Sequence, residues 1–293
     1  MTDPVFAPPP ASVAPGQAAI SFVNHATFLI RVAGMVVLTD PMFSPRCSPV
    51  GWAGPLRARP PGITLADLPR PDVVLLSHNH YDHMDLPSLR AIQQRFAPCF
   101  VTTLGNARPL ARLGIDATEL DWWQDVRLDT LRITVTPARH FAARTPFDRN
   151  RTLWGGFMIK TTGGQILFAG DSGAGLHWQD IRSRLGPPDV ALLPIGAYEP
   201  RWFMAAVHMD PAEAVQAHLA LAARHSIGMH FGTFQLTDEA IDAPLEALAE
   251  ARRAASLSPD TFTTLGFGET RLYDIDSSQG DRTQAGAARP FSG

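Results

Sequence analysis

The segment Ser-His-Asn-His-Tyr-Asp-His at positions 77–83 brings four metal-binding side chains together. His78, His80, Asp82 and His83 directly follow the apolar stretch 72–77, which predicts a buried strand. Alternation along a strand sends residues 78, 80 and 82 to one side, and a turn at the strand end lets His83 join them. Imidazole and carboxylate ligands at this density suit zinc or a similar ion. The alternative is a polar turn with solvated histidines, but three of the ten histidines fall within six residues, which chance explains poorly.

Further candidate ligands lie far away along the chain. Four ligands cannot complete two open metal sites, so partners must come from other segments. His140, Asp171 and His230 each follow a segment that predicts a strand. Taken alone, each is also compatible with a buried polar residue whose hydrogen bonds are satisfied. Their shared position at strand ends favours one site at the carboxyl ends of the strands.

Strand-like and helix-like segments alternate along the chain, and hairpin signals are frequent in the first half. Two mixed sheets with outer helices fit this pattern better than a single doubly wound sheet. The predicted strands are residues 18–31, 35–38, 72–77, 100–104, 131–137, 152–160, 165–169, 190–193 and 226–230, and the predicted helices are 87–97, 178–185, 211–224 and 244–255.

Composition sets the class of protein. The 293 residues include 25 Lys and Arg against 28 Asp and Glu, so the net charge of −3 gives no general field for nucleic acid. An apolar content of 45% excludes disorder of the whole chain. Cys47 and Cys99 cannot form a disulfide framework. Because no apolar run reaches the roughly 18 residues of a membrane span and the first residues lack the features of a signal peptide, we expect a cytoplasmic protein.

The chain is expected to form one compact domain over residues 18–276, because no repeat or low-complexity linker interrupts that stretch. Residues 1–17 are a lead rich in proline, which we expect to be extended and to pack little by itself. Residues 277–293 contain few apolar residues and are expected to form a flexible tail.

The order HxHxDH, then a distant His, Asp and His, resembles the metallo-β-lactamase superfamily. The similarity extends to the family of N-acylphosphatidylethanolamine-hydrolysing phospholipases D and its bacterial relatives, and spans roughly residues 18–260. That resemblance implies a four-layer αββα sandwich, an α/β fold, with a two-metal site. The segments that carry it are 38–57, 77–86, 137–140, 168–173, 193–204, 208–214 and 229–234.

The resemblance also implies a role for each ligand. Three histidines would hold the first ion and three residues the second, while Asp171 would bridge the two. The first set is His78, His80 and His140, and the second is Asp82, His83 and His230. Asp82 is thereby expected to be catalytic as well as a ligand. We expect two divalent ions, zinc first, with manganese or iron also compatible with this ligand set.

Metal-bound imidazoles need acceptors for their other ring nitrogen. Asp40, His25 and Asp85 are the candidates for contacting the ligands in this way. For Asp40, which precedes Pro41, the alternative is a simple turn residue.

The resemblance places His208 near the substrate phosphate, where it could donate a hydrogen bond or protonate the leaving oxygen. The alternative is a capping or packing residue before the helix that starts at residue 211. Tyr198, Arg201 and Trp202 could form a wall of the cleft, with Arg201 facing the phosphate. The alternative for Arg201 is a structural pair with a carboxylate such as Glu199.

The leading hypothesis is a metal-dependent phosphodiesterase of phospholipase D type, acting on a small or lipid-like phosphodiester. A lactonase resembling ascorbate-6-phosphate lactonase is the first alternative, and a nuclease of the same superfamily is the second. A metal-binding scaffold without turnover is the third. We expect no nucleic-acid partner. The short lead gives peripheral membrane contact little support, and a homodimer is left open.

Overall fold

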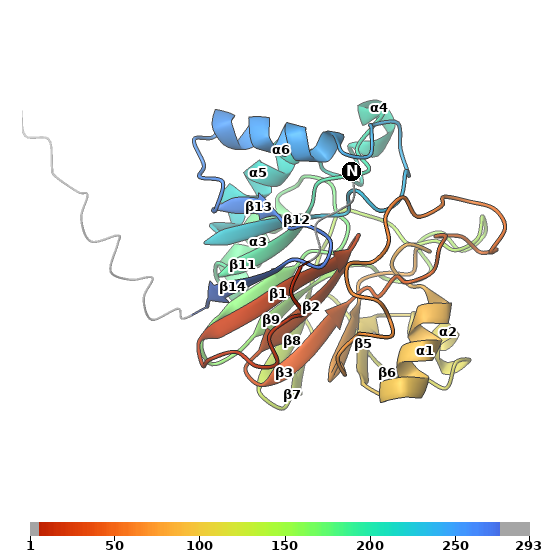
Figure 1. Ribbon diagram of the computed structural model, residues 1–293. Helices are drawn as coiled ribbons and strands as arrows, with labels where there is room; N and C mark the ends of the chain where they lie inside the picture. The colour runs from red at the N-terminus through yellow and green to blue at the C-terminus, as the bar shows by residue number, and fades with distance from the viewer. Residues whose placement is uncertain (1–5, 276–293) are drawn as a thin grey trace, which may run out of the picture.

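The computed structural model describes residues 6–275, in which two seven-stranded sheets pack face to face (Figure 1). The first sheet has the order β14 (Thr270–Asp274), β1 (Gln17–Asn24), β2 (Thr27–Val32), β3 (Met35–Thr39), β4 (Val73–Leu76), β5 (Cys99–Thr103) and β6 (Ala117–Leu120). The second has the order β13 (Phe262–Thr264), β12 (His225–Met229), β11 (Val190–Pro194), β10 (Gln165–Phe168), β9 (Gly156–Lys160), β8 (Leu131–Thr136) and β7 (Asp125–Leu128).

Each sheet is antiparallel on one side and parallel on the other. In the first sheet β14, β1, β2 and β3 pair antiparallel, whereas β3 to β6 pair parallel. In the second, β7 to β10 pair antiparallel and β10 to β13 pair parallel. The expectation of two mixed sheets is confirmed. Parallel neighbours end at the same edge of a sheet, which collects the loops that follow them.

Helices cover the outer faces of both sheets (Figure 1). Helices α1 (Leu86–Phe96) and α2 (Ala107–Ala111) lie on the first sheet, and α3 (His177–Leu185), α5 (Pro211–Leu221) and α6 (Ala243–Ala254) lie on the second. The short α4 (Arg201–Met204) precedes α5. This arrangement is the four-layer αββα sandwich that the sequence predicts. Among residues 6–275, no helix combines the length and hydropathy needed to cross a membrane.

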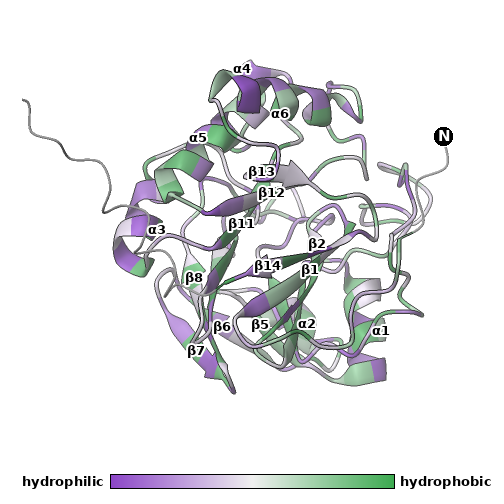
Figure 2. Cartoon of the chain, turned by 60° about the vertical axis from the view of Figure 1, so that its left-hand side comes forward, coloured by the Kyte–Doolittle hydropathy of each residue, from purple (hydrophilic) through white to green (hydrophobic). Residues whose placement is uncertain are grey.

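Side-chain alternation sorts each central strand between two cores. In β4, Val73 and Leu75 join the large core that extends between the sheets, whereas Val74 and Leu76 pack toward α1. All four are buried, which explains why this strand reads as an unbroken apolar run. In Figure 2 hydrophobic colour is prominent in the central strands, and the outer helices carry both hydrophilic and hydrophobic colour.

The predicted elements agree with the structure except where a strand bends or a segment is short and polar. Residues 18–31 form two strands instead of one, because His25 adopts a left-handed φ of 47° and turns the chain. The helix predicted over 211–224 ends at Leu221, where Ala222 adopts a φ of 49°. The strand predicted over 152–160 begins only at Gly156. The sequence analysis missed α2, α4, β6, β7, β13 and β14.

The described part of the proline-rich lead makes a few contacts with the domain. Arg31 donates to the carbonyl of Ala11 (3.2 Å), and Ile275 donates to the carbonyl of Gly16 (2.8 Å). Residues 6–16 are all exposed or partly exposed, and the expectation that this lead packs little by itself stays a prediction. The predicted tail, 277–293, lies outside the described residues.

Candidate metal centre

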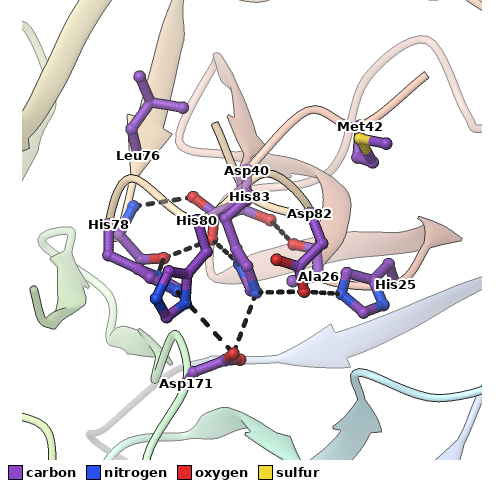
Figure 3. Close-up of polar contacts among 12 residues, drawn as sticks. His25, Ala26, Asp40, Met42, Leu76, His78, His80, Asp82, His83 and Asp171 are labelled. Carbon is purple, nitrogen blue, oxygen red and sulfur yellow. Dashed lines mark hydrogen bonds and ion pairs between the residues drawn. The ribbon is translucent and has the colours of Figure 1, made fainter. Parts of the chain in front are cut away.

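The loops at the ends of four strands bring the predicted ligands into one cluster. The loop 77–83 follows β4 of the first sheet. His140, Asp171 and His230 follow β8, β10 and β12 of the second sheet. Figure 3 shows Asp171 lying across from the histidines of the 77–83 loop. The predicted position at strand ends is what brings all seven side chains together.

Three ring nitrogens converge in a first ligand group. His78 Nε2 lies 2.9 Å from His80 Nδ1, and His140 Nε2 lies 3.1 Å from the same atom. His140 donates through Nδ1 to the carbonyl of Val207 (3.0 Å), which leaves its Nε2 with a lone pair directed at the group. A single proton on His80 Nδ1 can satisfy only one of its two neighbours. This group can therefore accept a cation.

Asp82, His83 and His230 form a second group. Asp82 Oδ2 lies 3.4 Å from His83 Nε2 and 3.3 Å from His230 Nε2. Asp171 Oδ2 lies 3.1 Å from each of those nitrogens. It also lies 3.8 Å from His140 Nε2 and 4.0 Å from that of His78. Asp171 thus stands between the two groups, as expected of a bridging ligand.

Buried polar atoms without hydrogen-bond partners test whether this cluster fits a metal. His83 Nε2, His230 Nε2 and Asp171 Oδ1 are buried and make no hydrogen bond among the described residues. When the His83 ring is neutral and donates through Nδ1 to Asp40, its Nε2 lone pair faces the Asp171 carboxylate. Burial lowers the pKa of His83, but Asp171 and Asp82 outweigh it and hold this pKa well above its usual value, so the carboxylates favour a positive charge at this position. Two electron-rich atoms buried against each other are costly unless a positive charge lies between them. These residues fit divalent cations with nitrogen and oxygen ligands, zinc among them.

Asp40 fixes the orientation of two of the histidines. It is fully buried and accepts hydrogen bonds from His83 Nδ1 (2.7 Å), from the Ser77 backbone N–H (2.8 Å) and from Ser77 Oγ (2.5 Å). Since Ser77 Oγ donates to Asp40, it accepts from His78 Nδ1 (2.8 Å). Both histidines consequently turn Nε2 toward the ligand groups. Asp40 therefore does more than form a turn, and its predicted contact with a ligand is confirmed.

Of the other two residues that were expected to contact the ligands, His25 does so and Asp85 does not. His25 donates through Nε2 to Asp82 Oδ2 (2.9 Å), and its ring lies 4.0 Å from that of His230, so it holds the second group. Asp85 instead binds Ser44 Oγ (2.8 Å) and Ser88 Oγ, and contacts none of the ligands. The expectation for Asp85 is wrong, because the start of α1 turns its carboxylate toward these serines.

Left-handed backbone is concentrated around the cluster. His25 (φ 47°), Asp40 (φ 30°) and His230 (φ 64°) adopt conformations that cost a non-glycine residue of order 1 kcal/mol or more each. Gly170 (φ 61°) precedes Asp171, and a Cβ there would lie 2.8 Å from the Gly155 carbonyl and 2.9 Å from Ser77 Cβ. Glycine is therefore needed at position 170, where the chain brings Asp171 of the second sheet close to the 77–83 loop.

Charge in the cluster is set by burial and by the facing groups. Burial alone raises the pKa of Asp171, but His230 and His83 outweigh it and hold this pKa well below its usual range. Burial, then the neighbouring His83 and His80, keep the pKa of His78 well below its usual value. At His230 burial is overcome by Asp171 and Asp82, which raise the pKa to about 9. The two carboxylates thus favour positive charge at the centre of the cluster.

His208 lies beside the ligands, as expected. Its ring centroid is 4.9 Å from that of His140 and 5.3 Å from that of His230. Its Nδ1 is buried without a hydrogen-bond partner among the described residues. Burial lowers the pKa of His208 to about 4 against the opposing charge of Asp171. The ring is therefore neutral at pH 7.

A cavity of about 340 Å³ opens onto the ligands. Its lining includes ligand side chains and His208 together with apolar residues. The polar or charged lining residues are His80, Asp82, Arg149, Asp171, His208, His230 and Thr237, and the others are Phe141, Ala197, Phe203, Met204, Ala206, Val207 and Leu236. Phe203 and Met204 belong to the loop 198–204 that was expected to form a wall of the cleft, whereas Phe141, Arg149 and Leu236 were not predicted from the sequence. The only feature of the sequence that could have indicated Phe141 and Arg149 is that they lie near His140 along the chain.

Tyr198, Arg201 and Trp202 do not line this cavity. Arg201 pairs with Glu213 (2.6 Å) and lies 3.6 Å from Asp210, which uses its guanidinium within the fold. Trp202 is 87% exposed, whereas Tyr198 is buried. The expectation that Arg201 faces a phosphate here is corrected: its role is the structural pair, with Glu213 as the partner in place of Glu199.

Replacing Asp40 with asparagine should weaken metal binding. The amide can no longer accept from both Ser77 and His83 as a carboxylate does, so His83 loses its fixed orientation. Loss of such a support typically costs 10- to 100-fold in metal affinity. Competition with a zinc chelator measures the affinity, and the matched control is Asp85→Asn, which alters a buried carboxylate that touches no ligand. Equal affinities for D40N and D85N would contradict this account of Asp40.

Comparison with known proteins agrees with the fold and with the cluster of metal-binding side chains. The family model of the Beta-lactamase superfamily domain matches residues 36–231. The chain is 39% identical over 239 residues to an uncharacterized protein of Mycobacterium tuberculosis. The matched region covers 80% of this chain and 63% of that protein's length. It is 37% identical over 263 residues to a Caenorhabditis elegans protein named N-acyl-phosphatidylethanolamine-hydrolyzing phospholipase D 1, covering 85% of this chain and 74% of that one.

Among solved structures, Igni18, a novel metallo hydrolase from the hyperthermophilic archaeon Ignicoccus hospitalis, has the same fold. The TM-score is 0.67 at 23% sequence identity, and the match covers 89% of this chain and 100% of that one. The fold, the ligand cluster at the strand ends and the matching family model lead to one conclusion: the chain belongs to the β-lactamase superfamily.

Proposed function

We propose that this protein is a metal-dependent phosphodiesterase of phospholipase D type that binds two divalent cations, zinc being the expected metal. The observation that carries the proposal is the position of Asp171, within 4.0 Å of nitrogens from both ligand groups at the cavity. The similarity to the nematode protein named as a phospholipase D supports the substrate class. The activity and the substrate are inferences for this chain.

Each ligand has a defined part in this proposal. His78, His80 and His140 would hold one cation, and Asp82, His83 and His230 the other, with Asp171 shared. Cations held there would act as Lewis acids toward the phosphoryl oxygens and lower the pKa of a water molecule. Asp82, whose carboxylate is fixed by His25 and lines the cavity, is the predicted catalytic carboxylate.

His208 is proposed to bind the substrate phosphate. It lines the cavity between ligand rings, and its buried Nδ1 has no partner among the described residues. An imidazole N–H aimed at a phosphoryl oxygen would supply a hydrogen bond to a charged acceptor. Substrate orientation then depends on His208 together with the metal ligands.

The apolar side of the cavity supports a substrate with a hydrocarbon part. Phe203, Met204 and Leu236 line the same cavity as the ligands. Burying aliphatic groups against these side chains would contribute binding energy in proportion to the area covered. We therefore propose a small or lipid-like phosphodiester as the substrate, in preference to the lactone of the alternative hypothesis.

Substrate class is tested by comparing bis(p-nitrophenyl) phosphate with a panel of lactones, using the zinc-loaded protein. We expect phosphodiester turnover to exceed lactone turnover per active site. The variants Asp171→Ala and His78→Ala should both lose hydrolysis, since each removes a ligand, whereas Asp125→Asn, on an exposed ion pair with Arg132, should not. Efficient lactone opening without phosphodiester hydrolysis would refute the proposal in favour of a lactonase.

Replacing His208 with alanine should lower turnover roughly 10- to 100-fold, the worth of one hydrogen bond to a charged group. If His208 holds the phosphate, the loss should be similar for an alkyl and a nitrophenyl phosphodiester, and the metal content should not change. His225→Ala, at the opposite end of β12 from His230, serves as the control. A much larger loss on the alkyl substrate would instead show that His208 protonates the leaving group, and loss of a metal would show that it is a ligand.

A further inference from the structure

One arginine lines the cavity with a guanidinium that does not hold other parts of the fold in place. Arg149 lies along the same cavity as Asp82, Asp171 and His208. Its guanidinium carbon lies 4.0 Å from the centroid of the Phe141 ring. Among residues 6–275, no hydrogen bond or ion pair of this guanidinium is present. Its N–H groups are thus open to a ligand in the cavity.

Two nearby arginines show the contrast. Arg144 stacks on Tyr81 (3.9 Å) and donates to the carbonyls of Asn79 (2.7 Å) and Met84 (2.9 Å). Arg201 binds Glu213 (2.6 Å) and two backbone carbonyls. Both guanidiniums therefore hold loops in place. Arg149 alone of the three combines a position in the cavity with donors that the described residues do not engage.

The loop that carries Arg149 is held on both sides. Asp148 Oδ1 accepts from the backbone N–H groups of Arg144 (2.9 Å) and Thr145 (2.8 Å). Asn150 donates through its backbone N–H to the carbonyl of Ala142 (2.7 Å). The backbone at Arg149 is thereby fixed, and stacking on Phe141 limits the side chain. Such preorganisation reduces the entropy lost on binding an anion.

Phe141 contacts both this cation and two of the ligand histidines. The Phe141 ring centroid lies 4.6 Å from that of His80 and 5.0 Å from that of His140. The guanidinium stacks on this ring, and among residues 6–275 it makes no hydrogen bond to the histidines. Its donors can therefore bind a group other than the phosphoryl group proposed to bind at the ligands.

We propose that Arg149, stacked on Phe141, forms a second anion site, and that the substrate carries a further anionic group besides its phosphodiester. This inference rests on the proposed function. A carboxylate or phosphate suits the planar guanidinium, which can bind two oxygens at once. Arg149 is thus a specificity-determining residue that selects phosphodiesters with an acidic substituent over those with a neutral one.

Binding, without turnover, tests this proposal. The probes are 4-carboxyphenylphosphonate and its neutral counterpart 4-carbamoylphenylphosphonate, titrated calorimetrically into the zinc-loaded full chain. The wild type should bind the carboxylate about two- to fivefold more tightly, as expected for one exposed charge pair. Arg149→Gln should bring the ratio of the two affinities close to one, and Arg149→Lys should retain part of the preference. Arg151→Gln removes an exposed charge two residues away that does not line the cavity, and should keep the wild-type ratio.

Several results would overturn the second anion site. An unchanged ratio in R149Q, including an equal loss of affinity for both probes, would show that Arg149 does not distinguish the second group. A wild type that binds the two probes equally, or binds neither, would also contradict it. Absence of phosphodiester turnover is a separate result from the hydrolysis assay. It would refute the proposed function even where the binding ratio behaves as expected.

Discussion

The Asp171 carboxylate is the point on which the site depends, because it comes from the second sheet and must meet imidazoles that the first sheet supplies. Its Oδ2 lies 3.1 Å from both His83 Nε2 and His230 Nε2. This proximity requires Gly170 to pass closely by Ser77 and Gly155, where a Cβ would not fit. It also requires Asp40 to orient His83 from the other side. A buried carboxylate among lone pairs is stabilised only by a positive charge, so packing of the sheets and cation binding are linked.

The ligands could be predicted from the sequence because their types are rare and their spacing is local. His78, His80, Asp82 and His83 follow a strand that its own apolar run identifies. The distant members were found from their positions at predicted strand ends, and the resemblance supplied their roles. The supporting residues were harder, because their partners are set by tertiary packing. Asp40 follows the end of β3 and Asp85 precedes the start of α1, and each lies within two residues of a proline, yet only Asp40 reaches a ligand. Short polar elements such as β6 and β14 were missed because they gain their stability from pairing with neighbours, as β14 does with β1.

The arginines show the same limit for substrate recognition. Arg201 stands in a motif that attracted a functional interpretation, but Glu213 and Asp210 occupy its guanidinium. Arg149 lies outside the sequence motifs that were singled out. It lines the cavity, and its guanidinium stacks on Phe141. Side-chain type does not distinguish a structural arginine from a binding one; the carboxylates within reach do. The lining of the cavity therefore combines candidate metal ligands, one arginine and several apolar residues, which several loops supply.

The most direct test of the account is the number and position of metal ions in the full chain. Anomalous diffraction at the zinc edge, from crystals grown with zinc, locates the ions independently of any activity. The account predicts two peaks, one among His78, His80 and His140 and one among Asp82, His83 and His230, with Asp171 in contact with both. A single peak, or an Asp171 carboxylate turned away from the ions, would contradict it.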